Sequence, residues 1–163
     1  MRHLGHAAGE TAVPDTQQRV AILLVEDNPT DAELCLRSLK KRNITNDVVW
    51  LQDGAEALDY LFCRGVYEGR SPDHQPTVVL LDLRLPKIDG KEVLRQIKAD
   101  DKLKSIPVVV LTSSGEERDI AECYTVGANS FVVKPIEFGK LAETVARLGY
   151  YWSLINTPPQ QAR

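Results

Sequence analysis

Hydrophobic residues in this chain gather in five short, nearly continuous runs, and each run precedes a stretch with the apolar spacing of an amphipathic helix. Such runs are typical of strands that are buried on both faces of a parallel sheet. Five strand–helix units predict an α/β fold, a doubly wound (βα)5 flavodoxin-like sandwich with strand order 2-1-3-4-5. The predicted strands are Val20–Val25, Asp47–Leu51, Thr77–Leu81, Ile106–Leu111 and Ser130–Val133.

Local signals mark the helices that follow the first two strands. Asn28, directly before a proline, favours a helix start, since asparagine caps helices well and proline suits the first turn. Asp53 with Glu56 three positions later has the pattern of a capping box. Gly65 suits the end of this second helix, and the polar stretch Val66–Pro76 predicts an unusually long loop before the third strand.

The pattern divides the chain into three parts. Residues 1–18 are polar and rich in small side chains, without the apolar core of a signal peptide, and we expect a disordered leader there. Residues 19–148 hold the five strand–helix units, and residues 149–163 extend the last helix into a tail. The chain has no apolar run near the roughly 20 residues that a membrane-spanning helix needs.

Composition and charge narrow the function. The chain has 163 residues with a net charge of −3, which gives no electrostatic reason to expect nucleic-acid binding. The three cysteines are scattered and form no CxxC pair, and the three histidines have no metal-ligand spacing. Reduced thiols in a cytoplasmic protein are therefore the favoured interpretation, ahead of a redox or zinc role.

Polar residues with complementary chemistry follow four of the five strands. Glu26 and Asp27 follow the first strand, Asp82 the third, Thr112 the fourth and Lys134 the fifth. Ligands of doubly wound sheets bind outside the carboxyl ends of the strands, near the point where the strand order reverses. We therefore expect these five side chains to meet at one edge of the sheet.

This residue set suits phosphoryl chemistry. Carboxylates packed together repel one another, and a divalent cation relieves the repulsion. All-oxygen ligands suit Mg²⁺, with Mn²⁺ as a substitute. The Asp82 carboxylate could attack phosphorus to form an acyl phosphate, while Thr112 and Lys134 bind the phosphoryl oxygens.

The motifs around these residues resemble the receiver domains of two-component response regulators. Asp82 and Thr112 are 30 positions apart and Thr112 and Lys134 are 22 apart, as in that family. The matching segments are Val25–Asn28, Leu80–Leu83, Pro86, Asp89–Gly90, Leu111–Ser113 and Val133–Pro135. Order and spacing match together over about residues 19–148, which makes the resemblance specific.

The resemblance implies a role for each site residue. Asp82 would take a phosphoryl group from a phosphohistidine of a sensor histidine kinase. Mg²⁺ would be bound by Glu26, Asp27, Asp82 and the backbone carbonyl of Arg84. The Arg84 side chain, two residues past the phosphoacceptor, would influence how fast the phosphoryl group is hydrolysed.

The resemblance also implies a switch. The Thr112 hydroxyl would turn toward the phosphoryl oxygens, and Phe131 on the neighbouring strand would rotate into the space left behind. An aromatic residue on a strand is equally well explained as part of the core, and the two interpretations are compatible.

The signal is expected to leave through partner contacts. Only fifteen residues follow Leu148, so the protein would be a stand-alone signalling protein rather than an enzyme. The last helix carries an apolar stripe whose outer members overhang the domain, and such stripes mark interfaces. A homodimer through Leu148, Trp152 and Ile155 is therefore predicted.

A narrower resemblance concerns the kinase. The long Val66–Pro76 loop and the Tyr150–Trp152 extension are similar to stand-alone regulators that pair with bacterial phytochrome kinases. A phosphorelay or chemotaxis-type receiver is the alternative within the family.

Two alternatives come from other classes. A flavodoxin-like flavoprotein needs a first loop rich in Ser, Thr or Gly to hold phosphate, whereas Glu26 and Asp27 would repel an anion. An aspartyl-nucleophile, Mg²⁺-dependent phosphatase uses similar residues, but its nucleophile follows the first strand within a DxD motif. Here the acidic pair comes first and Asp82 comes later.

Overall fold

The computed structural model describes residues 2–4, 21–41, 47–113, 116–134 and 137–154. The strands are β1 (Arg2–Leu4), β2 (Ala21–Val25), β3 (Asp47–Leu51), β4 (Val78–Asp82), β5 (Val108–Thr112) and β6 (Ser130–Val133). The helices are α1 (Pro29–Lys41), α2 (Gly54–Leu61), the 3-10 turn η1 (Gly65–Tyr67), α3 (Gly90–Ala99), α4 (Glu117–Val126) and α5 (Phe138–Leu154).

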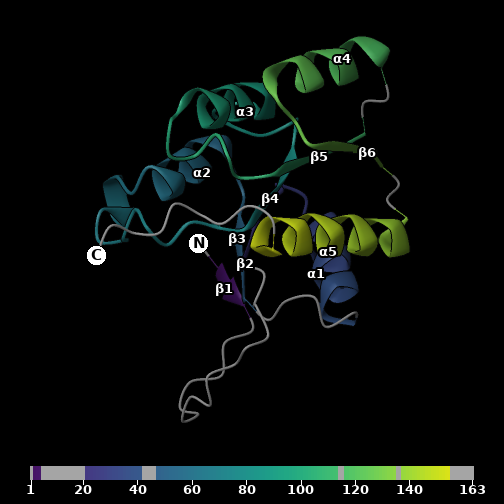
Figure 1. The fold of residues 1–163 in the computed structure, drawn as a ribbon, viewed down its shortest axis with the longest axis horizontal. Coiled ribbons are helices and arrows are strands. Elements are labelled where there is room, and N and C mark those ends of the chain that lie inside the picture. Colours follow the sequence, from purple (N-terminus) through teal and green to yellow (C-terminus); the bar gives the residue numbers. More distant parts are fainter. Residues whose placement is uncertain (1, 5–20, 42–46, 114–115, 135–136, 155–163) are drawn as a thin grey trace.

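The strands form one sheet in the order β1-β3-β2-β4-β5-β6 (Figure 1). Strands β2 to β6 pair in parallel, so the predicted order 2-1-3-4-5 is confirmed for the five strand–helix units. The interior strands β4 and β5 are buried along their whole length, which explains their continuous apolar sequences.

An additional strand lies at the β3 edge of the sheet. β1 pairs antiparallel with β3, with Arg2 opposite Trp50 and Leu4 opposite Val48. The sequence pattern did not predict this strand, because three residues are too few to establish an alternation of apolar and polar positions. The rest of the expected leader, residues 5–18, lies outside the described part of the chain.

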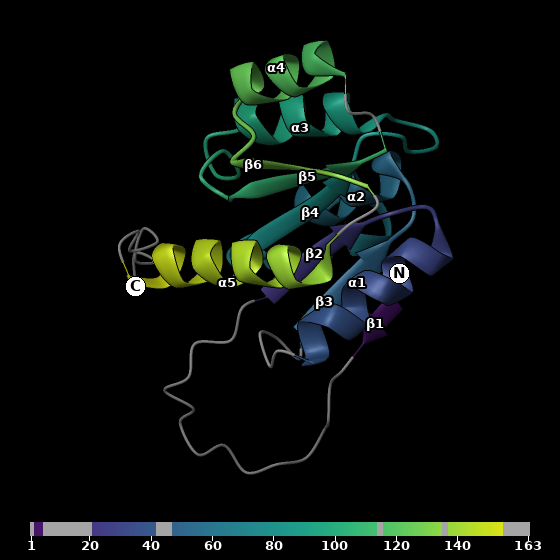
Figure 2. The ribbon, with the colours of Figure 1, turned by 90° about the vertical axis from the view of Figure 1, so that its right-hand side faces the viewer.

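Helices cover both faces of the sheet (Figure 2). α1 and α5 lie side by side on one face, where Leu39 and Leu141 belong to one apolar core. α2, α3 and α4 cover the other face, where Leu58, Leu94 and Cys123 belong to the second core. Side chains of each strand alternate between the two cores, as a doubly wound sheet requires.

The predicted helix caps are present, but the end of α2 differs from the prediction. Asn28 Oδ1 accepts hydrogen bonds from the amides of Thr30 and Asp31, at 2.9 and 3.2 Å. Asp53 Oδ1 accepts one from the Glu56 amide at 2.7 Å. α2 ends at Leu61 rather than near Gly65, because Cys63 with φ 53° turns the chain out of the helix, and Gly65 instead begins η1.

None of the helices in the described residues is long and apolar enough to cross a membrane. All three cysteines are free: Cys35 and Cys123 are buried and Cys63 is partly exposed.

Candidate functional site at the carboxyl edge of the sheet

The predicted site residues lie at one edge of the sheet because they end neighbouring parallel strands. Glu26 directly follows β2, Asp82 and Thr112 are the last residues of β4 and β5, and Lys134 directly follows β6. Glu26, Asp82 and Thr112 are the only polar residues with a buried side chain among the described residues. Burial of polar groups is unfavourable unless they are paired, so this concentration at a single edge points to function.

The Lys134 ammonium holds the site together. Its Nζ donates to Glu26 Oε2 at 2.8 Å, to Asp82 Oδ2 at 2.9 Å and to Asp31 Oδ2 at 2.9 Å. The three N–H donors of the ammonium therefore meet three carboxylates, one after β2, one at the end of β4 and one on α1. The Lys134 amide also donates to the Thr112 carbonyl at 2.7 Å, which fixes the backbone beneath the ammonium.

Asp31, the third partner of Lys134, is not among the site residues predicted from the sequence. It lies in the first turn of α1, four positions after Asp27, and its side chain is about one-third exposed. The available signal was a carboxylate in the first turn of the helix that directly follows the acidic pair. Such a residue lies near the same edge of the sheet as the strand ends, because α1 begins there.

Burial dominates the electrostatics of Glu26. The side chain is 1% exposed, and burial raises the pKa of Glu26 to about 7, with Asp82 raising it further and the Lys134 hydrogen bond opposing the change. Burial also lowers the pKa of Lys134, but its hydrogen bonds to Glu26, Asp82 and Asp31 outweigh that effect and raise it. The cluster therefore holds a firmly protonated lysine against a carboxylate that titrates near neutral pH.

Neighbouring residues orient the Glu26 carboxylate and backbone. Glu26 Oε1 accepts from the Asn28 amide at 3.2 Å, and the Glu26 carbonyl accepts from the indole nitrogen of Trp50 at 2.8 Å. The Glu26 amide donates to the Leu51 carbonyl at 3.0 Å, as a continuation of the β2–β3 pairing.

Three carboxylates at this edge could hold a metal ion. Glu26, Asp27 and Asp82 each offer an oxygen, and these oxygens all lie within 4.8 Å of one another. Asp27 is exposed and gives access from solvent, whereas the other two are buried. An all-oxygen set that includes water-accessible positions suits Mg²⁺ or Mn²⁺, and the Lys134 ammonium already supplies a positive charge at the same carboxylates.

The loop after β4 shapes the other side of Asp82. The Arg84 amide donates to Asp82 Oδ1 at 3.0 Å, so the Arg84 backbone lies beside the carboxylate while its side chain is exposed. Gly90 permits this loop to fold back, since a Cβ there would lie 2.2 Å from the Asp82 carbonyl oxygen. Its amide donates to the Leu83 carbonyl at 2.8 Å.

The two residues of the predicted switch lie on neighbouring strands. Thr112 is fully buried at the end of β5. Phe131 lies on β6 opposite Val110, and its half-buried ring packs against the core beneath α2, α3 and α4. The ring is partly exposed on an edge strand, which is compatible with both interpretations of this residue.

Only part of the predicted dimer stripe can be located. α5 extends to Leu154, and Leu148 is partly buried against the core beneath α1 and α5. The Trp152 side chain and all of Ile155 lie outside the described residues.

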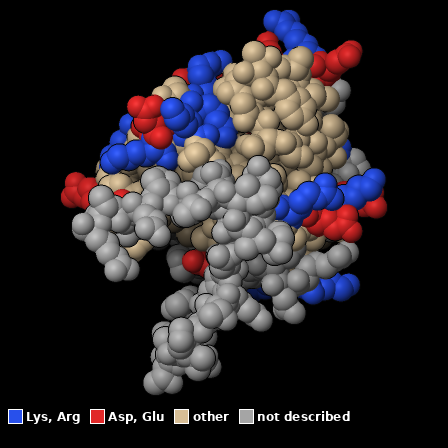
Figure 3. Space-filling model, viewed as in Figure 1, with Lys and Arg blue, Asp and Glu red and all other residues tan. Residues whose placement is uncertain are grey.

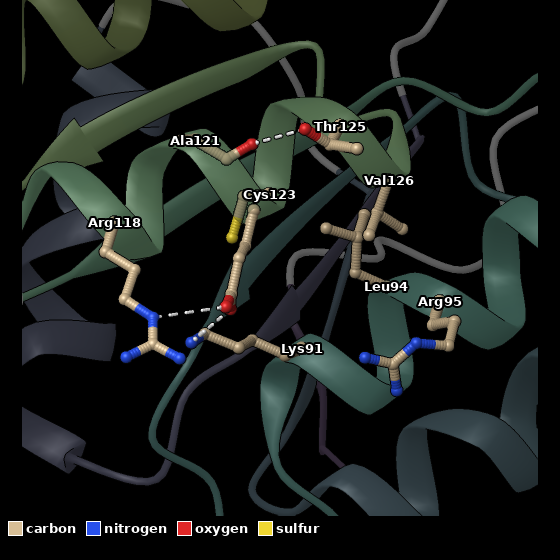
Figure 4. Close-up of a pocket in the computed structure, with 9 residues that line it drawn as sticks. Lys91, Leu94, Arg95, Arg118, Ala121, Cys123, Thr125 and Val126 are labelled. Carbon is tan, nitrogen blue, oxygen red and sulfur yellow. Dashed lines mark hydrogen bonds and ion pairs between the residues drawn. The ribbon is translucent and has the colours of Figure 1, made fainter.

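A hollow of about 400 Å³ lies between α3 and α4 (Figure 4). Its floor includes Leu94 and Val126, and charged residues such as Lys91 and Arg118 lie at its rim. None of its lining residues comes from a strand end, and it contains none of the buried polar groups described above. The hollow is therefore separate from the polar residues at the carboxyl edge of the sheet.

A parallel five-stranded sheet with acidic residues and a lysine at its carboxyl edge defines the receiver class, and the comparisons agree. The response regulator receiver domain family matches residues 22–146, so the chain belongs to that family. The match lies within the residues 19–148 expected to form the domain. Receiver domains are signalling proteins that sensor histidine kinases phosphorylate, typically on an aspartate.

Two relatives are similar over most of their length. The probable methanogenesis regulatory protein FilR2 of Methanothrix harundinacea is 43% identical over 92% of this chain and 94% of its own length. The response regulator Rcp1 of Synechocystis is 41% identical over 80% of this chain and 87% of its own.

Solved structures give the same result. The bacteriophytochrome response regulator AtBRR is 52% identical, with a TM-score of 0.71, over 85% of this chain and 99% of that one. The Mn²⁺-bound form of Rcp1 is 39% identical, with a TM-score of 0.70, over 85% of this chain and 98% of that one.

Proposed function

We propose that this protein is a stand-alone response regulator that accepts a phosphoryl group on Asp82 from a sensor histidine kinase. The observation that carries the proposal is the Lys134 ammonium, which contacts the buried Asp82 and Glu26 carboxylates at 2.9 and 2.8 Å. A cation fixed beside a buried nucleophile is positioned to bind the phosphoryl oxygens as they approach.

The transfer would need a divalent cation. Glu26, Asp27, Asp82 and the backbone carbonyl of Arg84 would hold Mg²⁺, or Mn²⁺ in its place. The 39%-identical Rcp1 binds Mn²⁺ in its crystal structure, which supports this choice. When bound, the metal would neutralise charge on the carboxylates and on the incoming phosphoryl group.

The protein's own groups would perform the remaining steps. An Asp82 oxygen attacks phosphorus, the P–N bond of the phosphohistidine breaks, and the imidazole leaves with the bonding electron pair. Lys134 and the Thr112 hydroxyl bind the phosphoryl oxygens, and the Arg84 amide, now beside Asp82 Oδ1, is close enough to contribute. The product is an acyl phosphate with a charge of about −1.5 to −2, in place of the −1 of an ionised aspartate.

The signal would pass from Thr112 to Phe131 and then to the surface at β6. A broad uncharged area covers the side of the molecule where α4, β5 and β6 lie (Figure 3), and Tyr124 on α4 and Val133 on β6 are exposed. This face and the last helix, with Leu148, Trp152 and Ile155, are proposed to form a homodimer. A beryllofluoride complex in which Thr112 and Phe131 keep their rotamers would contradict the switch.

The kinase is proposed to be a phytochrome-type photoreceptor in the cytoplasm. The support is the 52% identity to AtBRR, a bacteriophytochrome response regulator. FilR2, at 43% identity, is a probable methanogenesis regulatory protein, so a kinase that senses another stimulus is the alternative.

Phosphoryl transfer from a bacteriophytochrome kinase tests the proposal directly. The ³²P-labelled kinase is mixed with wild type, Asp82→Asn and, as a control on the same edge, Asp89→Asn, each with Mg²⁺ or with EDTA. Asparagine caps a helix as well as aspartate, so the control should fold and be labelled normally. The proposal predicts that wild type and Asp89→Asn become labelled in Mg²⁺ but not in EDTA, and that Asp82→Asn stays unlabelled. Labelling of Asp82→Asn equal to that of wild type would contradict the proposal.

The lifetime of the phosphorylated state is proposed to depend on Arg84. Its side chain is exposed, and its backbone amide lies 3.0 Å from Asp82 Oδ1, which brings the residue close to the phosphorylated carboxylate. Decay of the labelled protein should differ between wild type and Arg84→Asn, and equal decay rates would remove this role.

A further inference from the structure

Asp31 differs from the other two carboxylates that contact Lys134. Glu26 and Asp82 are buried at strand ends, whereas Asp31 lies on α1 and its side chain is about one-third exposed. Glu26 and Asp82 also belong to the acidic cluster that could hold a metal ion, together with Asp27. Asp31 is not a member of that cluster, so it is the only one of the three partners that metal binding leaves available.

A metal ion and the Lys134 ammonium would share two carboxylates, those of Glu26 and Asp82. A dication among Glu26, Asp27 and Asp82 would lie close to an ammonium that is hydrogen-bonded to two of these three groups. Like charges at such separations repel strongly where water is excluded. Lys134 must therefore give up part of its contact with Glu26 and Asp82 when the metal enters, and a buried ammonium needs another acceptor in their place.

We propose that Asp31 is a positioning residue that receives the Lys134 ammonium when a divalent cation binds, and that it thereby raises the affinity of the site for the cation. The inference rests on the proposed function, since it assumes that Glu26, Asp27 and Asp82 bind the metal. Asp31 acts in two ways: it relieves the repulsion between metal and ammonium, and it keeps Lys134 beside Asp82 for the incoming phosphoryl group.

Binding of Mn²⁺ to the unphosphorylated full chain tests the inference without any enzymatic readout. Free Mn²⁺ is measured by electron paramagnetic resonance for wild type, Asp31→Asn, Asp31→Glu and Glu33→Gln. Glu33 is the matched control, because it lies on the same helix and pairs with Arg37 at 3.1 Å on the exposed face. Its loss removes the same charge without touching Lys134.

The variants should separate positioning from simple loss of charge. Asp31→Asn should raise the Kd for Mn²⁺ about fivefold, since Lys134 then stays on the metal's own ligands and repels the metal. Asp31→Glu should restore the Kd to within about twofold of wild type, and Glu33→Gln should change it less than about twofold because its charge is screened. Equal effects of Asp31→Asn and Glu33→Gln would overturn the inference.

Removing Lys134 provides the second test. In a Lys134→Met background the competing ammonium is gone, so Asp31→Asn should change the Kd less than about twofold. An undiminished fivefold effect would show that Asp31 acts without Lys134, against the inference. If the double variant does not fold, the inference is tested by the Kd values of Asp31→Asn, Asp31→Glu and Glu33→Gln.

Mn²⁺ binding by wild type separates failure of the metal site from failure of the role of Asp31. Wild type that binds no Mn²⁺ would contradict the metal site itself, and with it the proposed function. Wild type that binds Mn²⁺ and loses no affinity in Asp31→Asn would contradict only the role of Asp31.

Discussion

Two glutamates of this protein accept a hydrogen bond from a lysine ammonium at the same distance, yet their pKa values move in opposite directions. Glu26 meets Lys134 at 2.8 Å at the carboxyl edge of the sheet, and Glu122 meets Lys91 at 2.8 Å between α4 and α3. Burial raises the pKa of Glu26 to about 7, whereas the hydrogen bond from Lys91 lowers the pKa of the exposed Glu122. The contact is the same, and the solvent around it is not.

The two lysine clusters differ in how far their charges are removed from water. The Lys91 cluster, which also includes Asp119, is partly solvated and resembles many surface ion pairs that contribute little to stability. The Lys134 cluster is desolvated, so each charge depends on the others to remain ionised. A buried cluster of this kind responds strongly to a metal ion or a phosphoryl group, and a solvated one does not.

Removing each lysine in turn should give the largest effect. Lys134→Met leaves Glu26 and Asp82 buried without their cation, and we expect a loss of about 3–5 kcal/mol in the free energy of unfolding at pH 8 in EDTA. Lys91→Met should lose about 0–1 kcal/mol, because its partners remain hydrated. Urea denaturation of both variants measures the difference.

Protonation and metal binding should both reduce the Lys134→Met loss. At pH 5 the orphaned Glu26 carboxylate is neutral, and Mg²⁺ supplies a replacement cation, so either condition should recover part of the stability. Equal losses for the two variants would mean that burial does not distinguish the clusters.

The pH dependence of stability should differ in sign between the two glutamates. The pKa of Glu26 is raised above its unfolded value, so its contribution is fully present below about pH 4.5 and is lost as the pH rises through about 7. Between these pH values the free energy of unfolding should fall by on the order of 3 kcal/mol. In Glu26→Gln this fall should be absent from urea denaturation curves recorded in EDTA.

Glu122→Gln is the matched control for this titration. The pKa of Glu122 is lowered, so any contribution is present above the ordinary pKa of a glutamate and is lost as the pH falls. Its removal should leave the decline between pH 5 and 7 intact. The two glutamates would not differ in this way if the stability of Glu26→Gln depended on pH as that of wild type does, or if both variants changed this dependence alike.

Salt should produce the smallest effect and should act on only one cluster. Raising NaCl from about 0.05 to 1 M shortens the screening length from roughly 14 to 3 Å and weakens exposed pairs. The stability difference between wild type and Lys91→Met should then fall to near zero, while that of Lys134→Met should change little. Denaturation at both salt concentrations in EDTA tests this, and a Lys134→Met difference that also vanishes would count against burial as the cause.

The fold was predictable because its signals are repeated along the chain. Five apolar runs alternate with amphipathic stretches, and Asn28 and Asp53 cap the helices where expected. The placement of Asp82 and Lys134 at one edge followed from topology alone, since the ends of neighbouring parallel strands meet. β1 was missed because three residues carry no periodicity, and its pairing with β3 depends on tertiary contact.

Asp31 was missed for a different reason. Its contact with Lys134 depends on how far the first turn of α1 is rotated toward the strand ends, and this angle is set by packing of the helix on the sheet. The Lys91 cluster likewise joins residues 28 and 31 positions apart, on two helices whose relative placement no local pattern gives.

The central claim, that the buried Asp82 carboxylate is the phosphoacceptor, is tested most directly by trapping the acyl phosphate. Protein phosphorylated by the kinase in Mg²⁺ is reduced with borohydride, which converts an aspartyl phosphate to homoserine, and tandem mass spectrometry locates the change. We expect homoserine at position 82 and unmodified aspartate at positions 27, 31 and 89. Homoserine at any of these other positions, with Asp82 intact, would contradict the account.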